Sequence, residues 1–399
     1  MERYEQQLLE GLGAFLRREP ARPLLKDTAD WEKLWRLADQ QKVLAMAADA
    51  LVPVLGRGDM ASAVLRRAAE DMAGQIRRDG AFAAAWKTLE GAGCRPLVVK
   101  GAVCRELYPK PDLRISADED LLLPPPELPA AADALARAGW AVSGGGQVTS
   151  CRDGRTGAYL ELHSALFPPD SEAYGWMNGL FDGAFDRAVE TMAAGVECRT
   201  LCPADHLRYL ILHACKHFLH SGVGIRQACD VSLAARAWGG GLDWGALTAS
   251  LAAARAERFA AGLMEVGRRH LGVDYPAPVT AWLEELRVDC GPLLEDLLAA
   301  GIYGSSSAQR LHSSRITLAA VSDGSGAHTA RQVLRTVFPP PDALAGRYPY
   351  LARRPWLVPV AWAQRLASYR DRSGPADARE SLAIGRERVG LLRRYGIID

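Results

Sequence analysis

Two aspartates in the segment RISADEDLL carry the most specific chemical signal of this sequence. Asp118 and Asp120 stand just before the apolar run Leu121–Leu123. On a strand, residues i and i+2 face the same way, so both carboxylates project together while Glu119 points to the opposite face. They stand about 6.6 Å apart along the strand, at a rise of about 3.3 Å per residue. Such a pair can hold Mg²⁺ ions that clamp the phosphates of a nucleotide during in-line displacement.

Neighbouring carboxylates repel one another unless a cation binds them, so this cluster predicts a missing positive partner. Glu161 is a candidate third ligand for such a cation. It lies in the segment AYLELH, where Tyr159, Glu161 and His163 alternate with Leu160 and Leu162. This period of two predicts a strand with its leucines buried and its glutamate on the other face. Aspartates before a strand are also common in solvated turns, which is the alternative interpretation.

Phosphate-binding groups surround these carboxylates in the sequence. Lys100 and Gly101 end the apolar run CRPLVVKG and lead into AVCRELY, which predicts a strand followed by a helix that begins at the glycine. A lysine and the amides of a helix N-terminus can hold phosphate at such a place. Arg114, four residues before Asp118, can neutralise a triphosphate.

A second polar cluster lies on the predicted helix 203–220. At about 100° per residue, His213, Lys216, His217 and His220 share one face, opposite an apolar stripe. We expect this face to turn towards the nucleotide, with Lys216 reaching the triphosphate. A face in contact with solvent is one alternative. A zinc site is another, because H-x-x-x-H can ligate zinc, although the glutamate of H-E-x-x-H is absent.

Other charged residues allow two interpretations each. Asp230, in RQACDV, can orient Lys216 or Arg226, or it can form an ordinary ion pair between helices. The arginines of the C-terminal tail are expected on solvated helix faces, with binding of RNA or a lipid surface as the minor alternative. These arginines are Arg353, Arg354, Arg370, Arg372, Arg393 and Arg394.

The composition excludes several classes of protein. The 399 residues carry a formal charge of +1 and are 49% hydrophobic, so no strong global field attracts nucleic acid or anionic lipid. The N-terminal segment has the pattern of an amphipathic helix and lacks the apolar core of a signal peptide. No uncharged apolar run approaches the roughly 18 residues that span a bilayer. Eight cysteines without a C-x-x-C pair predict reduced thiols, and together these features predict a cytoplasmic protein.

The pattern along the chain predicts a small α/β unit between helical regions. Beyond the strands already named, PELPAAADALARAG predicts a helix, and WAVSG, QVTSC and GAYLELH predict strands. A turn at Asp153-Gly154 joins the last two. Helical periodicity dominates on both sides, and residues 303–328 are rich in glycine and serine. We expect four regions: a helical domain (1–92), the α/β core (93–200), a helical domain that completes the nucleotide cleft (201–300) and a basic helical tail (301–399).

These segments resemble the bacterial family of uncharacterised nucleotidyltransferases in the DNA polymerase β-like superfamily. The resemblance rests on K-G-A after a strand, L-Y, R-x-x-x-D-x-D-L-L, an acidic strand ending in L-H, and a histidine-rich helix followed by an aspartate. It spans nearly the whole chain, and the KG and R-x-S-x-D-x-D parts also resemble abortive-infection nucleotidyltransferases. It implies Asp118 and Asp120 as metal ligands, Glu161 as the third carboxylate and Lys100–Gly101 as the phosphate-side turn.

The sequence departs from this pattern at two places. The usual glycine-serine start is here Gly101-Ala102, so a serine contact to phosphate is missing. The residue between the aspartates, usually apolar, is Glu119. A charge at this position indicates a partly open sheet face or a basic partner.

The residues and the resemblance together predict an α+β fold: a small polymerase β-like nucleotidyltransferase mixed sheet with flanking helices, embedded between N- and C-terminal helical regions. We expect a Mg²⁺-dependent nucleotidyltransferase, with Mn²⁺ as a second possible ion, that transfers NMP from an NTP such as ATP. The acceptor hydroxyl belongs to a tRNA, a protein or a small molecule. Asp118, Asp120 and Glu161 are the predicted metal-binding and catalytic residues. The predicted nucleotide-binding residues are Lys100, Gly101, Arg114, Ser116, His213, Lys216, His217 and Asp230.

Two alternatives of other classes remain at this point. A catalytically silent nucleotide- or RNA-binding module can use the same fold. A metal hydrolase can instead use His163 together with the histidines of 213–220.

Overall fold

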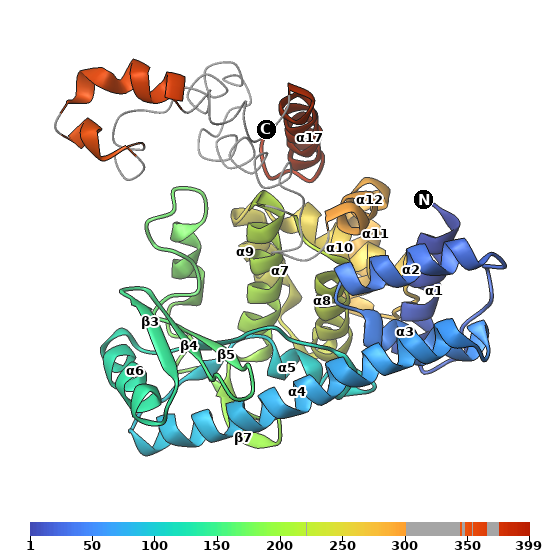
Figure 1. The fold of residues 1–399 in the computed structure, drawn as a ribbon, viewed down its shortest axis with the longest axis horizontal. Coiled ribbons are helices and arrows are strands. Elements are labelled where there is room, and N and C mark those ends of the chain that lie inside the picture. Colours follow the sequence, from blue (N-terminus) through green and yellow to red (C-terminus); the bar gives the residue numbers. More distant parts are fainter. Residues whose placement is uncertain (221, 301–343, 345–347, 353, 365–374) are drawn as a thin grey trace.

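The computed structural model describes residues 1–220, 222–300, 344, 348–352, 354–364 and 375–399. They form the α+β fold predicted from the sequence, a mixed sheet of seven strands flanked by helices (Figure 1). The helices are α1 (Arg3–Arg17), α2 (Thr28–Gln40), α3 (Leu44–Leu55), α4 (Asp59–Gly91), α5 (Ala102–Arg105), α6 (Leu128–Arg137), α7 (Pro203–His220), α8 (Ile225–Trp238), α9 (Trp244–Ala253), α10 (Glu257–His270), α11 (Ala277–Leu286), α12 (Gly291–Ala300) and α17 (Pro375–Arg394). The strands are β1 (Leu97–Val98), β2 (Glu119–Leu122), β3 (Ala141–Gly145), β4 (Val148–Arg152), β5 (Tyr159–His163), β6 (Val189–Ala193) and β7 (Val196–Thr200).

The N-terminal helices bury the apolar faces that the sequence predicts. The side chain of Asp27 caps α2 by accepting a hydrogen bond from the amide of Ala29 at 3.0 Å. Trp31, Leu34 and Trp35 then lie on the buried face of α2. Figure 1 shows α4 running from these helices along the molecule to the strands and α6, so one long helix connects the two parts.

The sheet has the order β3-β4-β5-β2-β1-β7-β6. At its centre β2 pairs with β5 in parallel and with β1 antiparallel, while β1 pairs with β7 in parallel. The sheet is therefore mixed, as predicted. Parallel pairing of β2 with β5 matters most for the site, because it places two segments with acidic residues side by side.

The hairpin of β6 and β7 is absent from the sequence-based prediction. At its turn Ala194 (φ 50°) and Gly195 (φ 75°) both adopt left-handed backbone conformations. That is the pattern of a type I′ turn, which asparagine-glycine or aspartate-glycine pairs usually signal. Alanine in the first of the two positions gives no such signal, so this turn is not recognisable from the sequence.

The connection between β4 and β5 is longer than the predicted Asp153-Gly154 turn. It spans residues 153–158. Thr156 donates a hydrogen bond from its hydroxyl to the Asp153 carboxylate at 2.7 Å, and Gly157 provides the left-handed position with φ 74°. Asp153 therefore organises the turn through its side chain, and Gly157 supplies the conformation expected of Gly154.

The two faces of the sheet have different partners. Leu121, Leu160 and Leu162 pack with Phe82 and Trp86 of α4 in one hydrophobic cluster. Residues on the opposite face of the same strands therefore point towards α7. This face carries Leu122 in the larger hydrophobic cluster, together with Asp120 of β2 and Glu161 of β5.

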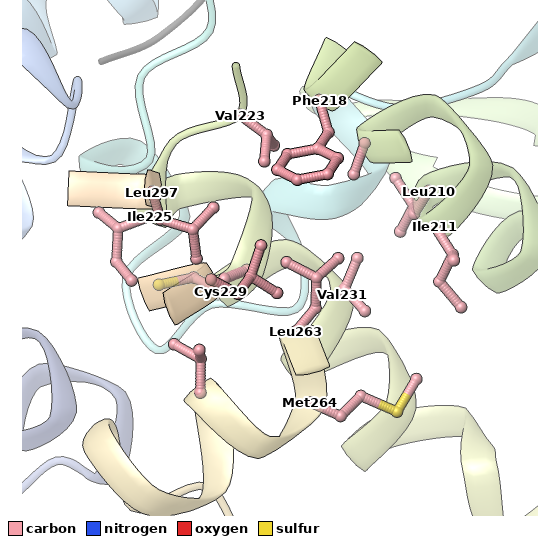
Figure 2. Packing of buried hydrophobic residues seen from close by; sticks show 14 of the residues in the cluster. Leu210, Ile211, Phe218, Val223, Ile225, Cys229, Val231, Leu263, Met264 and Leu297 are labelled. Atoms are coloured by element: carbon pink, nitrogen blue, oxygen red, sulfur yellow. The ribbon is translucent and has the colours of Figure 1, made fainter. Parts of the chain in front are cut away.

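The larger cluster joins the N-terminal helices to the helices that follow the sheet. Figure 2 shows its centre, where Leu210, Ile211 and Phe218 of α7 meet side chains of α8, α10 and α12. This packing uses the apolar stripe of α7, so its polar face remains for the side of the sheet.

The C-terminal helix α17 closes the end of α7. Arg388, 1% exposed, donates hydrogen bonds to the carbonyl oxygens of Phe218 and His220, the latter at 2.8 Å. A cation there satisfies carbonyls that a helix leaves unpaired at its C-terminus. Of the tail arginines, Arg354, Arg393 and Arg394 are exposed as predicted. Arg353, Arg370, Arg372 and residues 303–328 lie outside the described residues.

All eight cysteine thiols are free, and all but Cys202 are buried. In the part of the chain that the structure describes, none of the helices combines the length and the apolar character that crossing a membrane requires.

We expect the stability of the fold to fall in mild acid because of His206. This residue of α7 is 1% exposed and its Nδ1 lies 3.2 Å from the hydroxyl of Thr200 in β7. Burial lowers the pKa of His206 to about 4. Between about pH 6.5 and pH 4 the unfolded chain binds a proton that the folded protein does not, so the free energy of unfolding decreases as the pH falls.

Thermal unfolding followed by circular dichroism across this range measures the effect. The midpoint of the wild type should decline from pH 6.5 to pH 4, and His206→Gln should decline less steeply, since glutamine does not titrate. Equal slopes for the two proteins would contradict the assignment.

Candidate active site

A cleft of about 770 Å³ lies between the sheet and helices α7 and α8. Its walls carry six lysines and arginines, four carboxylates and four histidines, so positive charge exceeds negative charge. Such a lining suits a polyanionic ligand. The structure gathers most of the predicted site residues there: Lys100, Arg114, Asp118, Asp120, Glu161, His213, Lys216, His217 and Asp230. Gly101 and Ser116 are not among its lining residues.

Parallel pairing places Asp120 of β2 and Glu161 of β5 side by side, because the two are register partners. His163 follows Glu161 on the same face of β5. Its Nε2 lies 2.8 Å from Oδ1 of Asp120 and 3.3 Å from Oε2 of Glu161. One ligand atom from each of the three side chains lies within 4.8 Å of the others. The three groups are within reach of a single ion.

Asp118 stands apart from this group. It precedes β2, which begins at Glu119, so strand alternation does not fix its direction. Nζ of Lys100 lies 2.6 Å from Oδ2 of Asp120 and 3.5 Å from Oδ2 of Asp118. Lys100 also holds the pKa of Asp118 below its ordinary value. Within the protein, the positive partner that the sequence predicts for these carboxylates is Lys100.

Glu119 has a basic partner, which is one of the two explanations that the sequence offers for a charge between the aspartates. Oε1 of Glu119 lies 3.2 Å from Nη1 of Arg105, which is 2% exposed and also pairs with Asp79 at 2.7 Å. Burial raises the pKa of Glu119, and the guanidinium opposes this effect. The charge between the aspartates is thus part of a buried ion network on the α4 side of the sheet.

Glu119 also changes the role of the turn at Gly101. Its Oε2 accepts a hydrogen bond from the amide of Ala102 at 2.6 Å, so this amide is not open to a phosphate. Gly101 has φ 53°, and a Cβ there would lie 1.8 Å from Oε2 of Glu119. Glycine is required for the close approach of this carboxylate. The predicted phosphate contact of Gly101 is corrected accordingly, while Lys100 keeps its place in the cleft.

Arg114 forms a buried structural pair. Its Nε and Nη2 donate to the two carboxylate oxygens of Asp230 at 3.0 and 2.6 Å, and its Nη1 donates to the hydroxyl of Ser116 at 2.5 Å. Tyr108 donates a further hydrogen bond to Asp230 at 2.7 Å. Arg114 is 4% exposed, so its charge is committed to Asp230 rather than available to a triphosphate. Ser116 holds the guanidinium in place.

The expected partners of Asp230 are therefore replaced. Its carboxylate accepts no hydrogen bond from Lys216 or Arg226 among those with the described residues; Arg226 instead donates from Nη1 to the carbonyl of Ile115 at 2.7 Å. Asp230 of α8 and Arg114 before β2 are far apart in the sequence, and no local pattern links them. Their pair holds the strand region against α8.

The polar face of α7 lines the cleft opposite the strands, as the helical spacing predicts. Burial and the nearby charge of Lys100 lower the pKa of Lys216. Burial lowers the pKa of His217 to about 3 and that of His213 well below its ordinary value. The Nε2 atoms of these two histidines lie 3.3 Å apart. Near pH 7 the imidazoles of this face are therefore neutral.

The zinc alternative finds no support at α7. Among the described residues, the group with metal-binding geometry is Asp120, Glu161 and His163, and it includes no histidine of α7. The same observation removes the basis for a hydrolase that combines His163 with the histidines of 213–220.

His163 is the site residue that the sequence-based list omits. The sequence did contain a pattern that points to His163, because this residue shares a strand face with Glu161 and ends the L-H segment. Two carboxylates and an imidazole fit a divalent ion: the oxygens suit Mg²⁺ and Mn²⁺, and the imidazole favours a transition-metal ion. Oδ2 of Asp120 is buried and forms no hydrogen bond with the described protein, which leaves the Lys100 ammonium as its compensation.

Comparison with known proteins places these residues in one family. The model of a family described as uncharacterised nucleotidyltransferase matches residues 27–272. This range runs from the start of α2 to the end of α10 and contains every residue of the cleft discussed above. No curated protein and no solved structure matches the chain.

Proposed function

Because the chain belongs to the uncharacterised nucleotidyltransferase family, we propose that its cleft binds a divalent ion and an NTP and transfers NMP to an acceptor hydroxyl. Family membership gives the general reaction, transfer of a phosphorus-containing group. Mg²⁺ or Mn²⁺, the NTP and the residue roles are the proposal. The observation that carries it is the convergence of Asp120, Glu161 and His163 within 4.8 Å, in a cleft that Lys216 lines from the opposite wall.

The strand residues provide the ion site and the base. Asp120, Glu161 and His163 hold the ion, which when bound neutralises phosphate charge and orients the α-phosphate. The hydrogen bond from His163 lowers the pKa of Glu161, so this carboxylate is ionised near pH 7. Glu161 can then accept the proton of the acceptor hydroxyl. The hydroxyl oxygen bonds to the α-phosphorus, the bond from that phosphorus to the β-phosphate bridge breaks, and pyrophosphate leaves.

The two lysines stabilise the leaving pyrophosphate. Lys216 reaches the cleft from α7, and Lys100 from the end of β1. Lys100 now neutralises Asp118 and Asp120. With its charge balanced by a divalent ion, Asp120 would no longer need this ammonium, and Lys100 would be free to bind phosphate oxygen. The lysine would thereby contribute charge to the pyrophosphate during transfer.

Lys216→Ala is expected to raise the Kd for a non-hydrolysable NTP analogue with Mg²⁺ by about tenfold or more, since it removes a charge-assisted contact to phosphate. Titration calorimetry measures this change. His213→Ala should have a smaller effect, because its neutral imidazole offers less to phosphate. Lys87→Ala, at an exposed position of α4, is the matched control. Equal affinities for the wild type and Lys216→Ala would place Lys216 outside the nucleotide site.

The reaction itself is tested with each α-labelled NTP, Mg²⁺ and a cell extract. Label should move to one fraction of the extract, and the nature of that fraction identifies the acceptor as a tRNA, a protein or a small molecule. Nucleotide binding without any label transfer would instead support a silent nucleotide-binding module.

A further inference from the structure

A second cavity, of about 210 Å³, adjoins the cleft of the candidate active site. Lys42, Ala117, Gly157 and Arg226 line both spaces, so the two share a wall or an opening. Ala117 directly precedes Asp118, which places the junction beside the predicted metal-binding residues. We call the second space the side arm. Its other walls come from α2, α3 and α4 and from residues 115–116.

Four cations line the side arm, and two of them are matched by acids. Nη1 of Arg67 lies 2.5 Å from Asp71, and Asp39 lies 3.6 Å from Arg67 and 3.9 Å from Lys42. These four side chains form a balanced and partly exposed network. They contribute little net charge to the cavity.

The other two cations, Arg78 and Arg226, form no ion pair with any described residue. Arg78 donates from Nη2 to the side-chain oxygen of Gln75 at 3.0 Å, and Arg226 donates from Nη1 to a backbone carbonyl. The Nε of each guanidinium is buried and has no hydrogen-bond partner in the described protein. Burial lowers the pKa of both residues. Carboxylates near them, Asp79 for Arg78 and Asp118 and Asp230 for Arg226, offset part of this charge without forming an ion pair with it. Two largely buried guanidinium groups that lack an ion-pair partner at one cavity favour the binding of an anion there.

We propose that the side arm binds the acceptor and that Arg78 and Arg226 bind a phosphomonoester group on it. This proposal rests on the proposed function, since it assigns the acceptor of that reaction. The planar guanidinium donates paired hydrogen bonds that match phosphate oxygens. Arg78 lines the side arm and not the main cleft, whereas Lys216 lines the main cleft and not the side arm. Arg78 and Lys216 therefore belong to different spaces, whereas Arg226 borders both.

Ribose 5-phosphate and ribose are suitable probes, because they share hydroxyl groups and differ by one phosphomonoester. Each is titrated calorimetrically into the full-length protein, first alone and then with Mg²⁺ and a non-hydrolysable ATP analogue at saturation. Ribose 5-phosphate should bind at least tenfold more tightly than ribose in both series. Equal affinities for the two sugars would overturn the proposal. So would loss of ribose 5-phosphate binding at saturating analogue, because the side arm would then belong to the triphosphate.

Arg78→Met should weaken ribose 5-phosphate binding about tenfold and leave the affinity for the ATP analogue unchanged. Arg77→Met, at the exposed neighbouring position of α4, should change neither. If Arg78→Met does not fold, Arg226→Met serves as the second variant for the binding of ribose 5-phosphate alone, because Arg226 also lines the main cleft. Unchanged binding of ribose 5-phosphate in the folded variant would overturn the proposal. If the ATP analogue does not bind the wild type while ribose 5-phosphate does, the proposed function fails and the phosphate site remains.

Discussion

Asp120→Asn is expected to lower the rate of nucleotidyl transfer by about a thousandfold at saturating NTP. Asparagine keeps the shape of the side chain and removes the negative charge. Asp120 is 2% exposed and touches both the ammonium of Lys100 and the imidazole of His163, at 2.6 and 2.8 Å. Because Asp120 is buried, no exposed carboxylate can take its place as a ligand of the ion. The ion, and with it the stabilisation of charge at the α-phosphate, should be lost.

Initial rates with α-labelled NTP measure this loss, and Asp133→Asn, at an exposed position of α6, is the matched control. Without metal, Asp120→Asn should be slightly less stable than the wild type, because Lys100 retains only the more distant Asp118 at 3.5 Å. A simple acidic cluster with internal repulsion would instead be stabilised by the same change. Near-normal transfer activity in Asp120→Asn would contradict the metal-binding role.

Arg114→Met is expected to lower the free energy of unfolding by about 3–5 kcal/mol, because it leaves a buried carboxylate without its cation. Asp230 is 5% exposed and would retain only the hydrogen bond from Tyr108. Equilibrium denaturation with urea measures the difference. A triphosphate-binding role for Arg114, the original expectation from the sequence, would instead reduce NTP affinity and leave the stability close to that of the wild type.

The double variant Arg114→Met/Asp230→Leu separates the pair from its individual members. Replacing both buried charges by apolar groups of similar size is often close to neutral, so the double variant should recover most of the lost stability. If the double variant instead loses as much free energy of unfolding as the two single variants together, the residues act independently. That result would contradict the bidentate pair.

Sequence patterns predict those parts of the site that local geometry controls. Alternation along AYLELH places Glu161 and His163 opposite the leucines, and helical spacing places Lys216 and His217 on one face of α7. The structure agrees in both cases. Asp120 lies beside Glu161 because β2 and β5 are parallel. Parallel strands are common in an α/β unit such as the predicted one.

The parts that sequence patterns do not predict depend on contacts between distant segments. Arg114 pairs with Asp230 because α8 packs beside the residues that precede β2. The spacing of residues within either segment does not reveal this contact. Glu119 occupies the amide of Ala102 because Gly101 lets the carboxylate approach. Lys100 is predicted from the sequence as a phosphate ligand, whereas in the folded protein its ammonium pairs with Asp118 and Asp120.

One paired labelling measurement tests the central claim most directly. The protein is incubated with Mg²⁺ and the acceptor fraction, once with α-labelled and once with γ-labelled NTP. Nucleotidyl transfer predicts that the α label appears on the acceptor, that the γ label leaves in pyrophosphate, and that Asp120→Asn abolishes both. A γ label on the acceptor, or α label transfer that survives in Asp120→Asn, would contradict the account.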